Sequence, residues 1–125
     1  MKLRTLLLLS TLLAAFAFAQ QRIEYISRMT GSGKGKVTWK TRDNGGQLQA
    51  ELEAEGENLR RNSSYTLNVA NGKFIQKVVT NQFGRFHVAK TYRGTVRPSI
   101  KLGDRTILTD AAGVPVQVGM FVNKR

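Results

Sequence analysis

The 125-residue sequence has no cysteine, only two prolines and a single histidine. The absence of cysteine excludes a disulfide framework and a lipid-modified cysteine behind an export signal. One histidine, His87, cannot build a multi-histidine metal site. Flanking motifs of a nucleophilic enzyme are also missing around the serines and threonines. We therefore expect a non-enzymatic protein with no cofactor, no metal site and no catalytic residue.

The only long apolar run stands at the very start of the chain. Lys2 and Arg4 precede an apolar stretch from Leu6 to Phe18, and Ala17-Phe18-Ala19 places small residues just before Gln20. This order of charge, apolar run and small residues predicts a secretory signal peptide over residues 1–19. An uncleaved anchor is the alternative, although the run is shorter than the about 20 apolar residues that a spanning helix needs.

Cleavage after Ala19 would leave one domain, residues 20–125, near the common domain size. We expect a secreted or periplasmic protein that contacts a membrane only through the signal peptide before cleavage. An exported domain without disulfides must be stabilised by its core alone, which favours a bacterial source.

Basic charge is concentrated in the C-terminal part of the chain. Residues 20–57 carry six basic and six acidic side chains, whereas residues 58–125 carry twelve basic and two acidic ones. This asymmetry predicts an anionic partner, and the alternative is an evenly solvated surface that serves solubility.

Period-two alternation of apolar and polar residues recurs after residue 20, and no window shows a helical period. The expected strands are Ile23–Ser27, Lys34–Arg42, Gln47–Glu55, Ser64–Ala70, Lys73–Thr80, Arg85–Tyr92, Ser99–Leu102, Arg105–Thr109 and Val114–Phe121. In the fifth, adjacent apolar residues such as Val78 and Val79 predict a bulge or burial on both faces.

About eight or nine short strands joined by tight turns predict an all-β fold. We expect an antiparallel β-sandwich of about eight strands, immunoglobulin-like or prealbumin-like. A five-stranded oligonucleotide-binding barrel has too few strands.

The clearest unit is a hairpin around Asp43-Asn44-Gly45-Gly46. Asn-Gly is favoured in two-residue hairpin turns, because both central residues need positive φ. A turn centred on Asn44-Gly45 would pair Trp39 with Ala50 and Lys36 with Glu53. One face is then apolar and the other pairs opposite charges, so a slip by one residue would destroy the pattern.

Four features suggest chemistry, and each has a structural explanation that we prefer. Glu51, Glu53 and Glu55 share one strand face, where a salt-bridged surface is favoured over a glycosidase pair or a calcium site. Trp39 falls on the apolar face, which favours core packing over sugar stacking. His87 is expected to be an exposed strand residue. The segment Gly31–Lys36 lacks the first glycine, the hydroxyl residue and the helix of a phosphate loop, so we reject that interpretation.

The basic side chains of the C-terminal part are the candidate contacts for the anionic partner. They are Arg60, Arg61, Lys77, Arg85, Lys90, Arg93, Arg97, Lys101 and Arg105, with Phe83 and Tyr92 as candidate exposed aromatic contacts. The expected partner is an anionic polymer, an envelope component such as lipopolysaccharide, or another exported protein. Basic residues interleaved with aromatics also suit single-stranded nucleic acid, but export argues against an intracellular one.

Several short segments are similar to small exported bacterial β-sandwich domains. They are Gly33-Lys34-Gly35, Asn58-Leu59, Tyr65-Thr66-Leu67, Gly84-Arg85-Phe86, Pro98-Ser99-Ile100-Lys101-Leu102-Gly103-Asp104 and Gly119-Met120-Phe121. The resemblance spans about ninety residues and implies a domain that is generally non-enzymatic or uncharacterised. It carries over no functional residue.

Two further hypotheses remain beside the anion-binding module. The domain is a structural or interaction subunit that pairs through free sheet edges, or a glycosidase-type enzyme that uses Glu51, Glu53 or Glu55.

Overall fold

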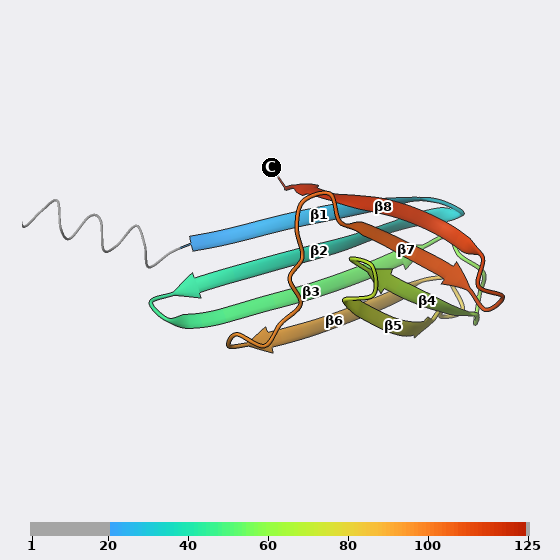
Figure 1. Cartoon of the computed structure of the whole chain (residues 1–125). Coiled ribbons are helices and arrows are strands. Elements are labelled where there is room, and N and C mark those ends of the chain that lie inside the picture. Colours follow the sequence, from blue (N-terminus) through green and yellow to red (C-terminus); the bar gives the residue numbers. More distant parts are fainter. Residues whose placement is uncertain (1–20, 125) are drawn as a thin grey trace, which may run out of the picture.

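A computed structural model describes residues 21–124 as eight strands (Figure 1). They are β1 (Gln21–Gly31), β2 (Gly33–Asn44), β3 (Gln47–Glu57), β4 (Ser64–Val69), β5 (Phe74–Val79), β6 (Phe86–Arg93), β7 (Arg105–Asp110) and β8 (Pro115–Asn123). The signal peptide predicted over residues 1–19 lies outside the described residues. Within residues 21–124, no helix has the length and apolar character needed to cross a membrane.

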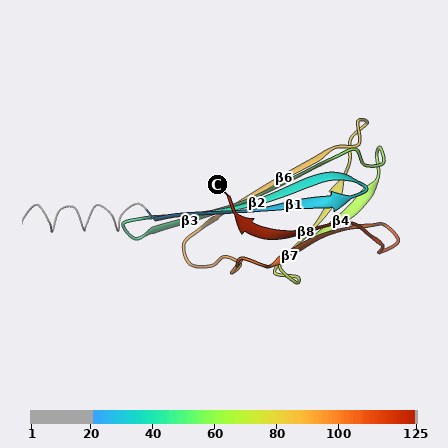
Figure 2. The same ribbon diagram turned by 90° about the horizontal axis from the view of Figure 1, so that it is seen from above.

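All eight strands belong to one antiparallel sheet in the order β5-β4-β7-β8-β1-β2-β3-β6. The sheet doubles over, so that β1, β2, β3 and β6 form one layer and β8, β7, β4 and β5 face it (Figures 1 and 2). The prediction of an all-β antiparallel fold is confirmed, as is the number of strands. The structure shows a continuous, nearly closed sheet where a sandwich was expected, and β5 and β6 are its two free edges.

The core lies between the two layers and is built by alternation along the strands. Trp39, Leu52, Leu67, Leu108 and Phe121 are each at most 2% exposed. The prediction that Trp39 packs in the core is therefore confirmed. A buried hydrogen bond of 2.7 Å between the hydroxyls of Ser27 and Thr106 crosses the same interior.

The β2–β3 hairpin has the predicted faces but a different register. The turn consists of Gly45 and Gly46, both at positive φ, and Trp39 pairs with Leu52 instead of Ala50. Two glycines adopt positive φ without a Cβ penalty, so they displace Asn44 from the turn. The register differs by two residues from the prediction, which preserves which side chains face the core.

Two other local predictions were wrong. Residues 99–102 form no strand; instead Ile100 is buried in the core from the loop that joins β6 to β7. β5 pairs with β4 without a bulge and buries only Phe74 and Val78. Its other apolar side chains, Ile75 and Val79, are 59% and 63% exposed. The one bulge in the described sheet lies between β7 and β8, at Leu108 and Thr109.

Candidate functional site

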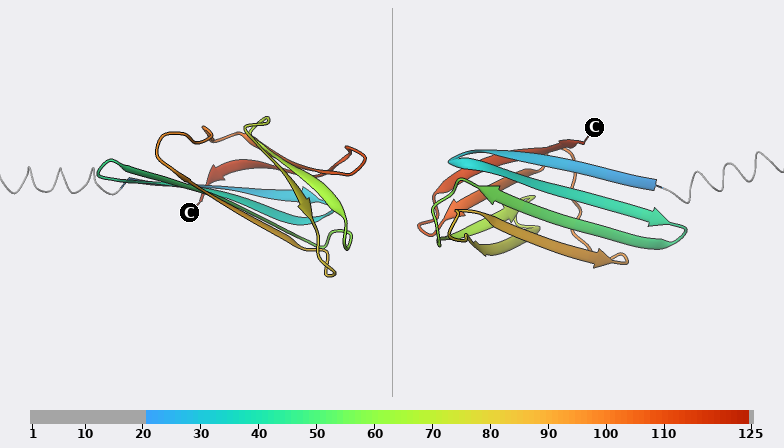
Figure 3. Two further views of the ribbon diagram at one scale, coloured as in Figure 1. Left: turned by 90° about the horizontal axis from the view of Figure 1, so that it is seen from below. Right: turned by 180° about the vertical axis from the view of Figure 1, so that it is seen from behind.

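A depression of about 880 Å³ lies where β1, β2, β3 and β6 end together. Its wall includes the outward-facing side chains of Arg28, Lys34 and Lys36, with Arg85 from the start of β6. Figure 3 (right) shows this layer from its outer side. The regular antiparallel register aligns these side chains across the strands, because Arg28 pairs with Lys36 and Lys36 pairs with Glu55 on the next strand.

Two loops that are far apart in sequence are bonded to each other beside the depression, and the second of them lines it. The loops are residues 58–63, between β3 and β4, and residues 80–85, between β5 and β6. The Leu59 amide donates to the Gly84 carbonyl oxygen at 3.1 Å, and the Asn62 amide donates to the Asn81 carbonyl oxygen at 3.1 Å. These bonds hold the backbone of the first loop, which carries Arg60 and Arg61, against the loop that carries Arg85.

Thr80 fixes the same pair of loops from inside. It is 2% exposed, and its hydroxyl accepts from the Ser63 amide at 2.9 Å and donates to the Arg60 carbonyl oxygen. The second loop is also closed on itself, because the Asn81 side-chain oxygen accepts from the amides of Phe83 and Arg85. The backbone that carries these arginines is therefore well fixed. We call Arg28, Lys34, Lys36, Arg60, Arg61 and Arg85 together the basic end.

Positive charge exceeds negative charge at the basic end. Lys36 is paired with Glu55 at 3.1 Å, and Glu57 is the other carboxylate in the wall of the depression. Among the described residues, Arg28, Lys34 and Arg85 form no ion pair. Unpaired guanidinium and ammonium groups around a concave surface favour the approach of an anion.

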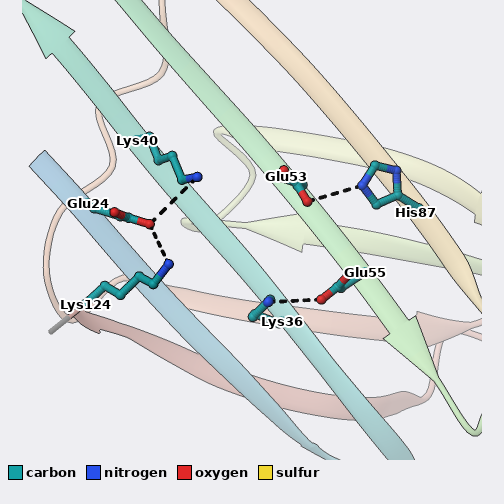
Figure 4. Close-up of polar contacts among 7 residues, drawn as sticks. All are labelled: Glu24, Lys36, Lys40, Glu53, Glu55, His87 and Lys124. Carbon is teal, nitrogen blue, oxygen red and sulfur yellow. Dashed lines mark hydrogen bonds and ion pairs between the residues drawn. The ribbon is translucent and has the colours of Figure 1, made fainter.

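The middle of the same outer face is neutralised by ion pairs (Figure 4). His87 Nε2 lies 3.3 Å from Glu53 Oε1, and the His87 side chain is exposed, as predicted. The salt-bridged interpretation is confirmed for Glu55, which pairs with Lys36 where Glu53 was expected. Glu53 contacts His87 instead, and Glu51 has no ion pair among the described residues. Glu51 lies opposite Lys40 on β2, where Thr38 was expected.

Glu24 on β1 links this strand to the end of β8, the neighbouring strand in the other layer. Its carboxylate accepts a hydrogen bond of 2.9 Å from Lys124 Nζ, at the end of β8, and lies 3.9 Å from Lys40 Nζ. The hydrogen bond from Lys124 lowers the pKa of Glu24 below its ordinary value of 4.5, and the charges of Lys124 and Lys40 lower it further.

We predict a small pH-dependent contribution of Glu24 to stability. Because its pKa is lowered by folding, the stabilisation is present above 4.5 and is lost as the pH falls through the folded-state pKa. At neutral pH, Glu24→Gln should lower the free energy of unfolding by about 0.5 kcal/mol, because the pair of Glu24 with Lys124 is solvent-exposed. In strong acid the substitution should have no effect. Urea unfolding at neutral pH and in strong acid measures the loss of stability, with Glu51→Gln as the control. A loss for Glu24→Gln that is equal at both pH values would contradict the assignment.

The predicted basic contacts do not share one face. Arg60, Arg61 and Arg85 gather at the basic end, whereas Lys77 and Arg105 lie on the outer side of β5 and β7. The others lie on β6 or in the following loop: Lys90, Arg93, Arg97 and Lys101.

Two of these side chains have local roles. Lys90 faces inward opposite Leu52, and its Nζ lies 5.8 Å from the centre of the Tyr92 ring. Arg97 Nη1 donates to the Gln49 carbonyl oxygen at 3.5 Å.

The two candidate aromatic contacts differ in placement. Phe83 is 68% exposed at the tip of the loop that carries Arg85, as predicted. Tyr92 is half-buried and packs on the core, with its ring centre 6.0 Å from that of Trp39. Burial raises the pKa of the Tyr92 hydroxyl above its ordinary value of 10.0. The prediction that Tyr92 is an exposed contact residue was therefore wrong.

Sequence reasoning missed three members of the basic end. The net charge of residues 20–57 is zero, so the charge asymmetry does not single out Arg28, Lys34 and Lys36. Antiparallel pairing returns these strands to the same end as Arg85. The signal that was present is the spacing of Lys34 and Lys36, two residues apart on the polar face of the predicted strand.

The fold and the site define a small antiparallel β-sheet protein with a cation-rich end. Within residues 21–124, no group of three or more histidine, aspartate or glutamate side chains is placed to hold a metal ion. A scan against protein-family models and a search of curated proteins both found no match. No family is thereby identified, and the all-β fold is compatible with the resemblance to small exported β domains.

Proposed function

We propose that this chain is an exported, non-enzymatic β-sheet module that binds an anionic partner through the basic end. The proposal includes export to the periplasm or medium of a bacterium after cleavage behind Ala19. It also includes a relationship of the doubled sheet to immunoglobulin-like or prealbumin-like sandwiches. The partner class is an anionic polymer or another anionic component of the envelope.

One observation carries the proposal: cations from three separate parts of the chain line one depression, and a fourth part is hydrogen-bonded to its border. β1 supplies Arg28, β2 supplies Lys34 and Lys36, and the loop before β6 supplies Arg85. The loop that carries Arg60 and Arg61 is hydrogen-bonded to the loop of Arg85 and adds two more cations beside the depression. Like charges so close together repel one another, and an anion that binds between them relieves that repulsion.

Retention on immobilised heparin tests the proposal. The variant Arg60→Ser/Arg61→Ser/Arg85→Ser should elute at lower salt than the wild type. Its affinity should fall about a hundredfold if each arginine contributes about 1 kcal/mol.

The matched control is Lys77→Ser/Lys101→Ser/Arg105→Ser, which removes the same charge elsewhere. Co-elution of the two triple variants would show that only net charge matters and would contradict a localised site. Retention of the wild type that does not depend on salt would contradict it as well.

Pairing through sheet edges is the second candidate, and the free edges β5 and β6 favour it. β6, however, directs Lys90 inward at its edge, and an inward-facing charge is a feature that keeps edge strands from pairing. A monomer in light scattering, with no partner in pull-downs, would exclude this candidate. The glycosidase candidate would be excluded if Glu53→Gln/Glu55→Gln changed stability alone.

A further inference from the structure

The outer face of the layer β5, β4, β7 and β8 differs in kind from the outer face just described. Apolar side chains gather on it: Ile75, Val79, Ile107, Val118, Met120 and Val122, which we call the aliphatic face. Five of them are 44–63% exposed, and Ile107 is half-buried. Their inward neighbours, such as Leu108 and Phe121, fill the core, so alternation leaves these six facing solvent.

Strand pairing places four of these side chains on the adjacent strands β7 and β8 and two on β5, with the polar outward side chains of β4 between the two groups. Val118 on β8 pairs with Ile107 on β7, and Ile107 shares Asn68 of β4 with Ile75 on the edge strand β5. Neighbouring strands lie about 4.8 Å apart, so this row of residues spans the width of the layer. The group on β7 and β8 is a contiguous exposed apolar surface, and such a surface marks an interaction site in a monomeric protein.

The charges on this face all have one sign. Arg105 pairs with Met120, and Lys77 lies on β5 between Ile75 and Val79. No carboxylate of the described residues lies among them. The nearest, Asp104 and Asp110, accept hydrogen bonds from backbone amides in the neighbouring turns. In contrast, the opposite outer face carries five glutamates, at positions 24, 51, 53, 55 and 57.

We infer that the aliphatic face binds an anionic lipid surface. Aliphatic side chains mixed with cations and without carboxylates match a bilayer interface, where apolar groups enter the acyl boundary and cations meet acidic headgroups. A second copy of this chain would place Lys77 and Arg105 against the same charges. A hydrophilic polymer would leave the aliphatic side chains in water. This site shares only Val79 with the lining of the depression at the basic end, and it extends the expected membrane contact beyond the signal peptide.

Co-sedimentation with vesicles tests the inference. The wild type should bind vesicles of phosphatidylglycerol and phosphatidylcholine and bind pure phosphatidylcholine weakly. Val118→Thr/Met120→Gln/Val122→Thr should lower binding to the anionic vesicles about tenfold, because three half-exposed aliphatic side chains no longer enter the bilayer. Lys77→Gln/Arg105→Gln should lower it about twenty-five-fold at low salt, since each cation near an anionic surface contributes about fivefold.

Matched controls separate the face from general effects. Val96→Thr/Leu102→Gln removes exposed aliphatic groups from the β6–β7 loop, and Arg22→Gln/Arg42→Gln removes two charges from the opposite face. Both controls should bind as the wild type does. All variants share one N-terminus, so any binding through residues 1–19 is common to them.

The inference fails if the aliphatic variant binds anionic vesicles as well as the wild type does. A wild-type dimer that the same variant converts to a monomer would assign the face to a second copy and overturn it. Arg60→Ser/Arg61→Ser/Arg85→Ser should lose heparin but keep vesicle binding, so the two proposals fail independently.

Discussion

Replacing Trp39 with alanine is expected to lower the free energy of unfolding by about 3–5 kcal/mol. Trp39 is 2% exposed, pairs with Tyr25 and Leu52 on the neighbouring strands and packs against the Tyr92 ring. Its removal leaves a cavity that the flanking strands cannot close. Because a domain of this size has only about 5–15 kcal/mol of stability, the variant should be largely unfolded on moderate warming.

Urea denaturation followed by circular dichroism measures the loss. Trp39→Phe is the control, because an aromatic ring in the same place retains most of the contacts and should cost much less. A loss below about 1 kcal/mol for Trp39→Ala would mean that the side chain is not a core residue.

Replacing Gly84 with alanine is expected to cost about 3 kcal/mol and to separate the two loops of the basic end. Gly84 has φ 72° and is buried, and a Cβ atom there would meet the backbone carbonyl of Leu59. The carbonyl oxygen of Gly84 also accepts a hydrogen bond from the Leu59 amide. The added methyl group would therefore disturb a hydrogen bond that joins the two loops. Heparin affinity should fall together with stability.

Gly113→Ala is the matched control for backbone strain. Gly113 has φ 81°, in the turn between β7 and β8, and no atom lies within 4 Å of the position of its Cβ. The substitution should therefore lower the free energy of unfolding by only about 1 kcal/mol and leave heparin binding unchanged. Equal effects of the two substitutions, measured by urea denaturation and heparin retention, would contradict the close contact of the loops.

Alternation along the chain was sufficient to predict most strands and the side chains that face the core. It could not distinguish pairings that differ by two residues, because these place the same side chains on the same face. The β2–β3 hairpin shows this: the predicted and observed registers both bury Trp39, and only the turn geometry of Gly45 and Gly46 separates them. Ile100 is buried without belonging to a strand, which alternation does not describe.

The site was predicted less well than the fold. Arg60, Arg61 and Arg85 were named from the local excess of charge, but Arg28 and Lys34 belong to a neutral part of the sequence. Their position beside Arg85 follows from the pairing of β1 with β2, of β2 with β3 and of β3 with β6, and the last of these joins residues 30 to 44 positions apart. The aliphatic face was also missed, because Lys73–Thr80 was expected to contain a bulge or to be buried on both faces.

Mapping of backbone amides by nuclear magnetic resonance tests most directly the claim that anions bind at the basic end. On titration with a short heparin oligosaccharide, the amides of Leu59, Arg60, Gly84 and Arg85 should shift most, and added salt should reverse the shifts. Shifts spread evenly over all basic residues, or centred on Arg93 and Arg97 at the far end of β6, would contradict the account.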